Sequence, residues 1–153
     1  GAVVLSACEP GAEPGVGPVV WGSVPQLGSA VRIEHTPPVF SQDGLSVFRW
    51  ATTSLAPIAA GAARAFGVEP QDLDAFVPHQ ANLRIIDPMG KALGLPPEKV
   101  ARDVRYSGNT SAASVPLALA KRAEAGELPS GSLALLFGFG GGLAYAGQVI
   151  RCP

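Results

Sequence analysis

The chain has 153 residues, enough for one domain or for one half of a larger two-lobed unit. Only 15% of the residues are charged and 47% are hydrophobic, so we expect another lobe or subunit to cover a substantial apolar face. An alanine- and glycine-rich composition inherited from a high-GC genome would explain the same numbers. The net charge of −1 gives no reason to expect nucleic acid as a partner.

The compartment is predicted from the apolar runs and the cysteines. No apolar run reaches the ~18 residues of a membrane span, so no membrane partner is expected. No basic segment precedes the first apolar residues, as a secretory signal would require. Cys8 and Cys152 are too few for a disulfide framework, so a cytoplasmic location is predicted. Because the chain opens inside a strand-like run without Met, we expect it to be part of a longer protein.

The first 43 residues are predicted to contain two strands. Apolar runs predict strands over residues 1–7 and 18–23, with a glycine- and proline-rich loop over 8–17 between them. The stretch 24–43 contains three further prolines and is predicted to be irregular.

Residues 44–66 show the periodicity of an amphipathic helix. Apolar residues recur at three- and four-residue spacing: Val47, Ala51, Leu55, Ile58, Ala62 and Phe66. Pro57 costs ~3 kcal/mol inside a helix, so we expect a kink or break there. Gly67 is predicted to follow the helix as its C-cap.

The remaining chain alternates between strands and helices. Strands are predicted over 75–77, 100–104, 132–137 and 143–151, and helices over 82–93 and 110–125. This alternation predicts an α/β fold with parallel strands joined by right-handed crossovers. Only the last two strands are joined by a glycine turn, and they should therefore pair antiparallel.

Three polar segments follow predicted strands, where open α/β sheets place their sites. They are VPHQAN with His79, SGNTSAAS with Asn109, and the glycine run FGFGGGL. Each has an ordinary structural explanation on its own: a hydrogen-bonded histidine, a helix cap, and a tight turn. The glycine run is not a dinucleotide fingerprint, because Leu143 occupies the third glycine position and a strand follows.

Together, VPHQANLRIID, GNTSAAS and FGFGGGLAYAGQVIR, in this order and spacing, resemble the C-terminal half of 3-oxoacyl-(acyl-carrier-protein) synthase III. The opening GAVVL is similar to the strand that begins that half, and residues 1–153 correspond to one C-terminal domain, most loosely over 8–43. The resemblance implies an α/β thiolase-like fold whose C-terminal half has a mixed five-stranded sheet with covering helices. It also implies a missing N-terminal half with the nucleophilic cysteine, and a homodimer of the complete enzyme.

The resemblance further implies a decarboxylative Claisen condensation of acyl-CoA with malonyl-acyl-carrier protein, which starts fatty-acid or polyketide chains. Acyl-CoA and the acyl carrier protein are substrates and partners, and no cofactor or metal is expected. His79 and Asn109 match the catalytic His and Asn, and Gly141 matches the residue whose backbone N–H helps form the oxyanion hole. Neutral His and Asn side chains can donate hydrogen bonds to an enolate oxygen, as this reaction needs.

Two further sets of residues carry over from the family. Phe48, Ala51 and Asn82 match positions that line its pantetheine tunnel. Basic positions around the tunnel mouth are matched by Arg49, Arg84 and Lys91, which would steer an acidic carrier protein. Ordinary surface charge is the alternative explanation for these three.

The chain departs from the family in lacking the nucleophile. Cys8 leaves a predicted strand next to Glu9, rather than lying at a helix N-terminus, and Cys152 is the penultimate residue. The chain alone is therefore expected to be inactive. Two alternatives to condensation stay open: acyl transfer to an oxygen or nitrogen nucleophile with His79 as general base, and a non-catalytic remnant. The starter acyl group is not predicted.

Overall fold

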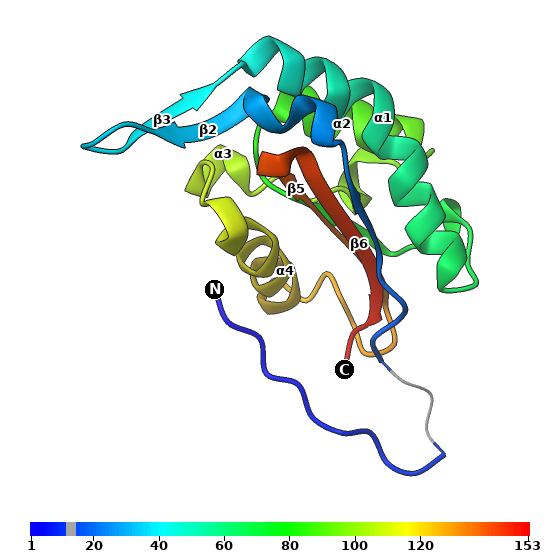
Figure 1. The fold of residues 1–153 in the computed structure, drawn as a ribbon. Helices are drawn as coiled ribbons and strands as arrows, with labels where there is room; N and C mark the ends of the chain where they lie inside the picture. Colours follow the sequence, from blue (N-terminus) through cyan, green and yellow to red (C-terminus); the bar gives the residue numbers. More distant parts are fainter. Residues whose placement is uncertain (12–14) are drawn as a thin grey trace.

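The structure is a computed structural model that describes residues 1–11 and 15–153. A central sheet is covered by α1 and α2 on one face and by α4 on the other, and a two-stranded hairpin projects from the body (Figure 1). The predicted α/β class is therefore confirmed.

The sheet contains β1 (Val20–Ser23), β6 (Ala144–Arg151), β5 (Leu133–Gly140) and β4 (Ala75–Pro78), in this spatial order. β4 and β5 are parallel, and the other neighbouring pairs are antiparallel, including β5 and β6 as predicted. The strand expected over 100–104 is reduced to a single parallel bridge between Val100 and Phe76 at the β4 edge. The chain then turns into the short helix α3 (Val104–Ser107), so the fifth strand is present only as this bridge.

The strand predicted over residues 1–7 is wrong. Val3, Val4 and Leu5 are exposed, and the segment runs outside the sheet (Figure 1). An apolar run predicts burial, but a strand also needs an available edge, and β1 occupies that side of β6. The loop predicted over 8–17 includes residues 12–14, which lie outside the described residues.

The irregular segment predicted over 24–43 is also wrong. A 3₁₀ helix, η1 (Pro25–Ala30), leads into an antiparallel hairpin of β2 (Val31–Glu34) and β3 (Val39–Gln42). Pro37 and Pro38 lie in the connection between the strands, where they interrupt no ladder hydrogen bond.

Helix α1 (Gly44–Ala65) packs across β5 and β6. Asp43 caps it by accepting a hydrogen bond from the Ser46 N–H at 3.1 Å. We predicted a kink or a break at Pro57; the helix is continuous there, so the break is absent. Pro57 lies on the exposed side, so water can satisfy the carbonyl left without its helical donor. Gly67 follows the helix with φ of 93°, as a C-terminal glycine should.

The other covering helices are α2 (Leu83–Ala92) and α4 (Ser114–Glu124). A short 3₁₀ helix, η4 (Ser111–Ala113), precedes α4, so the α-helix begins four residues later than predicted. The helix predicted over 82–93 is confirmed as α2, with Asn82 at its N-cap.

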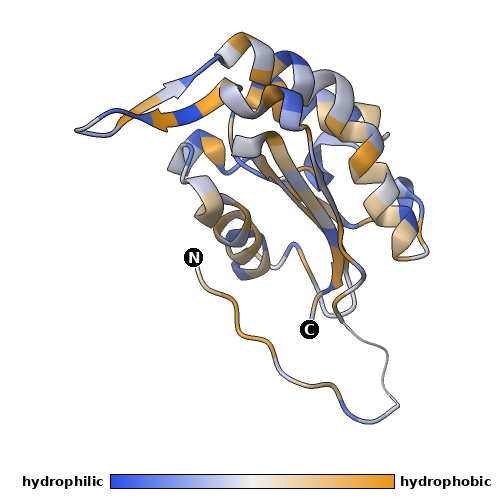
Figure 2. Ribbon diagram, in the orientation of Figure 1, coloured by the Kyte–Doolittle hydropathy of each residue, from blue (hydrophilic) through white to orange (hydrophobic). Residues whose placement is uncertain are grey.

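Two apolar clusters fill the space between these layers. The larger one joins α1 and α2 to the sheet, and the smaller one joins α4 to the other face. Figure 2 shows further apolar residues outside both clusters, in the hairpin and in the N-terminal segment. Within the described residues, no helix has the length and hydropathy needed to cross a bilayer.

Candidate active site

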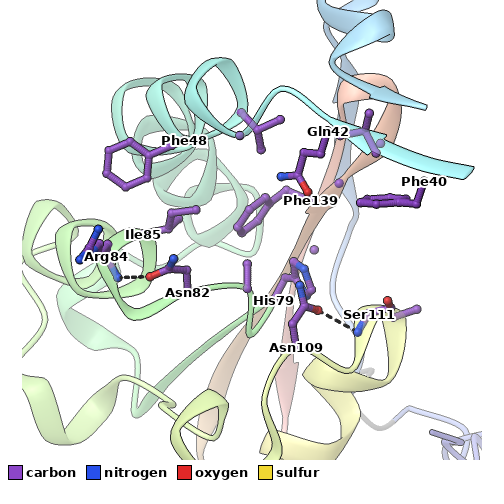
Figure 3. Close-up of a pocket in the computed structure, with 18 of the residues that line it drawn as sticks. Phe40, Gln42, Phe48, His79, Asn82, Arg84, Ile85, Asn109, Ser111 and Phe139 are labelled. Carbon is purple, nitrogen blue, oxygen red and sulfur yellow. Dashed lines mark hydrogen bonds between the residues drawn. The ribbon is translucent and has the colours of Figure 1, made fainter. Parts of the chain in front are cut away.

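A pocket of about 1110 Å³ opens at the carboxyl ends of the parallel strands β4 and β5. Its walls come from the hairpin, the first turns of α1 and α2, the segment before α4, and the end of β5 (Figure 3). Three helices thus begin at this pocket, and their N-terminal dipoles favour negative charge within it. The pocket is therefore suited to a reaction in which an anion develops.

His79 lies directly after β4 on the pocket wall. Its backbone N–H donates to the Phe137 carbonyl at 2.7 Å, which continues the pairing of β4 with β5. The ring nitrogen Nδ1 lies 2.7 Å from Ser114 Oγ, and the ring packs edge-on against Phe139 with centroids 5.2 Å apart. Burial lowers the pKa of His79 below its ordinary value of 6.5, so the imidazole is neutral at pH 7.

Asn109 reaches the same pocket from the loop between α3 and α4. Its Oδ1 accepts a hydrogen bond from the Ser111 N–H at 2.9 Å, and Gly108 has φ of 68°. Because the oxygen is held by the backbone, the NH₂ group of the carboxamide is directed elsewhere and can donate to a ligand. Figure 3 labels both His79 and Asn109 among the residues that line this pocket. The structure therefore brings together two residues separated by 30 positions in the sequence.

Gly141 lines the pocket at the connection between β5 and β6. Gly138 and Gly140 of β5 line it as well, and a Cβ at either position would meet no atom within 4 Å. This wall is therefore built from backbone, and a ligand can approach its N–H and C=O groups closely.

The predicted tunnel residues divide into two groups. Phe48 and Asn82 line the pocket, as does Arg84 from the predicted basic set. Ala51 is completely buried in the core beneath α1 and is not among the lining residues, so the structure does not bring it to the pocket.

The other two basic residues lie outside the pocket. Arg49 is exposed on α1 beside Phe48, and Lys91 is exposed in the last turn of α2. Of the predicted basic residues, only Arg84 lines the pocket. Its backbone N–H donates to Oδ1 of Asn82, the N-cap of α2, at 2.9 Å (Figure 3).

A buried hydrogen-bond network fixes the loop that carries His79. Gln80 is completely buried; its Nε2 donates to the carbonyls of Pro78 at 2.7 Å and Ala101 at 3.2 Å. Its Oε1 accepts from the Val104 N–H at 3.0 Å. The loop after β4 is thereby tied to the start of α3, which limits how far His79 can move.

A second network holds the segment that leads to Asn109. Lys121 of α4 donates to the Asp103 carboxylate at 2.6 Å and to Ser107 Oγ at 2.7 Å. The Asp103 side chain is almost fully buried, so this pair is less screened than a surface ion pair. Both catalytic candidates are therefore held by contacts within this chain.

Sequence reasoning missed several pocket residues. Phe139 lines the pocket and belongs to a quoted motif, which could have pointed to it. Ser114 also belongs to a quoted motif; it contacts His79 but is not among the lining residues. Phe40 and Gln42 come from the hairpin, which gave no sequence signal because it was read as irregular.

No thiol lines the pocket among the residues that the structure describes. Cys8 is exposed in the N-terminal segment, and Cys152 is buried at the other end of the sheet, where burial and the nearby Asp74 raise the pKa of its thiol. Neither cysteine is placed to act as a nucleophile beside His79. Nor do three metal-ligating side chains gather anywhere in the described parts of the chain.

Known proteins share this fold and much of this sequence. The family model of the 3-oxoacyl-[acyl-carrier-protein] synthase III C-terminal domain matches residues 63–152. A crystal structure of a priming β-ketosynthase from a polyketide biosynthetic pathway superposes with a TM-score of 0.87 and 43% identity over 92% of this chain and 46% of that one. The corresponding synthase III of Pseudomonas aeruginosa superposes with a TM-score of 0.88 and 33% identity, covering 96% of this chain and 47% of that one. The fold is therefore thiolase-like.

Curated relatives match over the whole chain. A β-ketoacyl-[acyl-carrier-protein] synthase III of Streptomyces coelicolor is 63% identical over 153 residues, which is 100% of this chain and 48% of the relative. One from Streptomyces avermitilis is 61% identical, over 100% of this chain and 49% of the relative. The chain belongs to the family of 3-oxoacyl-[acyl-carrier-protein] synthase III C-terminal domains. It spans about half the length of the curated relatives it matches.

Proposed function

We propose that residues 1–153 are the C-terminal domain of a condensing enzyme that joins acyl-CoA to malonyl-acyl-carrier protein with loss of CO₂, as the first step of fatty-acid or polyketide chain assembly. The observation that carries the proposal is the placement of a neutral His79 and of Asn109 on one wall of a single pocket. The proposed reaction uses these two thioesters as substrates and requires no cofactor.

The chemistry needs hydrogen-bond donors at a thioester oxygen. When the malonyl carboxylate leaves as CO₂, its bonding electrons move onto the thioester and its oxygen gains enolate charge. Donors from His79 and Asn109 stabilise that charge, each by ~3 kcal/mol if they act like other oxyanion donors. The enolate carbon then attacks the acyl-cysteine thioester, forms the new C–C bond, and expels the thiolate. The backbone N–H of Gly141 is proposed to stabilise the tetrahedral oxyanion of acyl transfer.

The cysteine is proposed to come from an N-terminal half of the same fold. In support, the described part of the chain leaves large apolar side chains uncovered. Trp21 on β1 is 77% exposed, and Ile33, Val39 and Phe40 of the hairpin are exposed as well. Apolar surface of this kind usually marks an interface. A second half and a second copy, in a homodimer, would both require such surface.

The carrier protein is proposed to dock near the first turns of α1 and α2. Phe48, Asn82 and Arg84 line the pocket there, and they are suited to a pantetheine arm with its amides and apolar carbons. Arg49 and Lys91 are exposed on the same two helices and would attract an acidic carrier protein by long-range steering.

Acyl transfer to an oxygen or nitrogen nucleophile is the second candidate. A neutral, half-buried His79 with a lowered pKa can also accept a proton as general base. The two functions differ in one product, because only the condensation releases CO₂.

The test measures CO₂ release from carboxyl-labelled malonyl-carrier protein by the complete protein that contains this chain. We expect His79→Ala and Asn109→Ala each to lower the rate roughly 100- to 1,000-fold, as removal of an oxyanion donor does. The matched control is His35→Asn, at the exposed hairpin turn where φ is 73°, a backbone conformation that Asn tolerates; it should keep the full rate. Acyl transfer without CO₂ release would refute the condensation and favour the second candidate.

A further inference from the structure

Ser114 is a buried polar residue that no step proposed so far uses. It is the first residue of α4 and the last residue of the GNTSAAS motif, and it is 1% exposed. Its hydroxyl lies between two groups of the loop after β4: Nδ1 of the His79 ring at 2.7 Å and the backbone N–H of Gln80 at 3.1 Å. A single hydroxyl thus connects α4 to the histidine that faces the pocket.

The hydrogens of this contact can be assigned by counting. A serine hydroxyl carries one hydrogen and two lone pairs. The Gln80 N–H can only donate, so it occupies one lone pair of Oγ. Within the described residues, Nδ1 of His79 is the other partner recorded for Oγ. If Nδ1 also donated, the buried hydroxyl hydrogen would have no recorded acceptor, which is unfavourable. The hydroxyl therefore donates to Nδ1.

We infer that Ser114 is a positioning residue that holds His79 in the tautomer with its proton on Nε2. Nδ1 then accepts from the hydroxyl, and the Nε2–H is the ring donor left for the pocket. In the described part of the chain, Nε2 has no recorded hydrogen-bond partner. The catalytic meaning of this assignment rests on the proposed function, because a histidine that stabilises an enolate oxygen must present an N–H to it.

The same contact opposes the charged form of His79. An imidazolium needs a hydrogen on Nδ1, which would again leave the Ser114 hydroxyl hydrogen without an acceptor. The groups packed around the ring give no compensation, because β5 contributes Phe139 and α4 contributes Ser114. Among the described residues lining the pocket, Arg84 on α2 is the only charged side chain and no carboxylate is present. Burial acts in the same direction by lowering the pKa of His79.

The tautomer can be read directly by NMR in the complete protein with ¹⁵N-labelled histidine. Long-range ¹H–¹⁵N spectra distinguish a protonated Nε2 from a protonated Nδ1, and the His79 signals are assigned by their absence in His79→Gln. At pH 7 we expect Nε2 protonated and Nδ1 unprotonated. Ser114→Ala should give a mixture of tautomers and a higher His79 pKa, and Ser114→Thr, which keeps the hydroxyl, should restore the wild-type pattern.

Ser132→Ala is the matched control. Ser132 is also buried, and its hydroxyl donates to the Pro129 carbonyl at 2.6 Å, outside the pocket-lining set. Its loss should leave the His79 tautomer unchanged, so that a general effect of removing a buried hydroxyl is separated from the specific one. If Ser114→Thr does not fold, Ser114→Cys provides a weaker donor of similar size and should give an intermediate pattern.

Activity provides the second measurement. Ser114→Ala should slow CO₂ release by roughly 10- to 100-fold, which is less than the effect of losing the histidine. The ring stays in place, but only part of the protein then carries the proton on Nε2. A wild-type spectrum with Nδ1 protonated, or a Ser114→Ala spectrum identical to it, would overturn the inference whatever the activity. A protonated Nε2 in a protein that releases no CO₂ would instead refute the proposed function and leave the Ser114 assignment intact.

Discussion

The network around Gln80 allows the sharpest prediction about stability. Gln80→Leu replaces the side chain with one of similar volume, so the cavity term is small and the effect comes from lost hydrogen bonds. The substitution leaves the Pro78 and Ala101 carbonyls and the Val104 N–H without their side-chain partner. Each buried group left unpaired costs about 1–3 kcal/mol, so the loss of three partners should cost roughly 3–9 kcal/mol in total.

The assay is urea unfolding of the complete protein, with the midpoint and slope measured for both forms. Gln71→Leu is the control, because Gln71 also donates to a backbone carbonyl, that of Leu93 at 3.2 Å, but is itself exposed. Water can replace that bond, and the control should lose less than about 1 kcal/mol. A Gln80→Leu protein within about 0.5 kcal/mol of wild type would refute the reasoning, because it would mean that the three backbone groups find other partners.

The remaining predictions concern pH, packing and a thiol. Folding lowers the pKa of His79 below 6.5, so just below that pH the unfolded chain binds more protons than the folded chain. The contribution of neutral His79 to the free energy of unfolding is therefore complete above pH 6.5 and is lost as the pH falls, which urea midpoints across pH 5–8 should show. Gly147→Ala should destabilise the folded protein by about 1–3 kcal/mol, because the new Cβ would lie 2.7 Å from the Phe137 ring. Gly61→Ala is the control: its Cβ would meet no atom within 4 Å, so thermal unfolding should show no loss of stability. The Cys152 thiol, buried and with a raised pKa, should be alkylated at pH 7 only after unfolding, as peptide mapping would show.

Much of the sheet could be predicted because its two parallel strands, β4 and β5, are largely buried. Residues 75–78 and 133–137 are apolar runs between turn signals, and the glycine turn before residue 144 identified an antiparallel pair. The run over 1–7 is equally apolar, yet it forms no strand in this structure. Local hydrophobicity reports a tendency to be buried, but pairing depends on an edge elsewhere in the molecule, which a single run does not specify.

The candidate site was predictable to the extent that it follows strand ends. His79 comes directly after β4, and the glycine segment ends β5 and continues past it, so parallel pairing of β4 with β5 brings them to one edge. The hairpin wall with Phe40 was not predictable in this way. Its two strands are short, and its prolines lie in the turn between them. From the sequence alone, a short hairpin with prolines in its turn could not be distinguished from an irregular loop.

The division between what this chain contains and what it lacks has a physical logic. Donors for an oxyanion must be held rigidly before charge develops, because reorganising them during the reaction would cost part of the stabilisation. The contacts that hold His79 and the Asn109 loop all lie within this chain, through Ser114, Gln80 and the Lys121–Asp103 pair. The donor set can therefore be formed without help from another half. In the proposed function the nucleophilic cysteine would come from the other half, and assembly of the halves would have to place it against the substrate carbonyl. Under the proposed function, the buried hydrogen bonds of this chain would thus fix the oxyanion donors before the other half contributes its nucleophile.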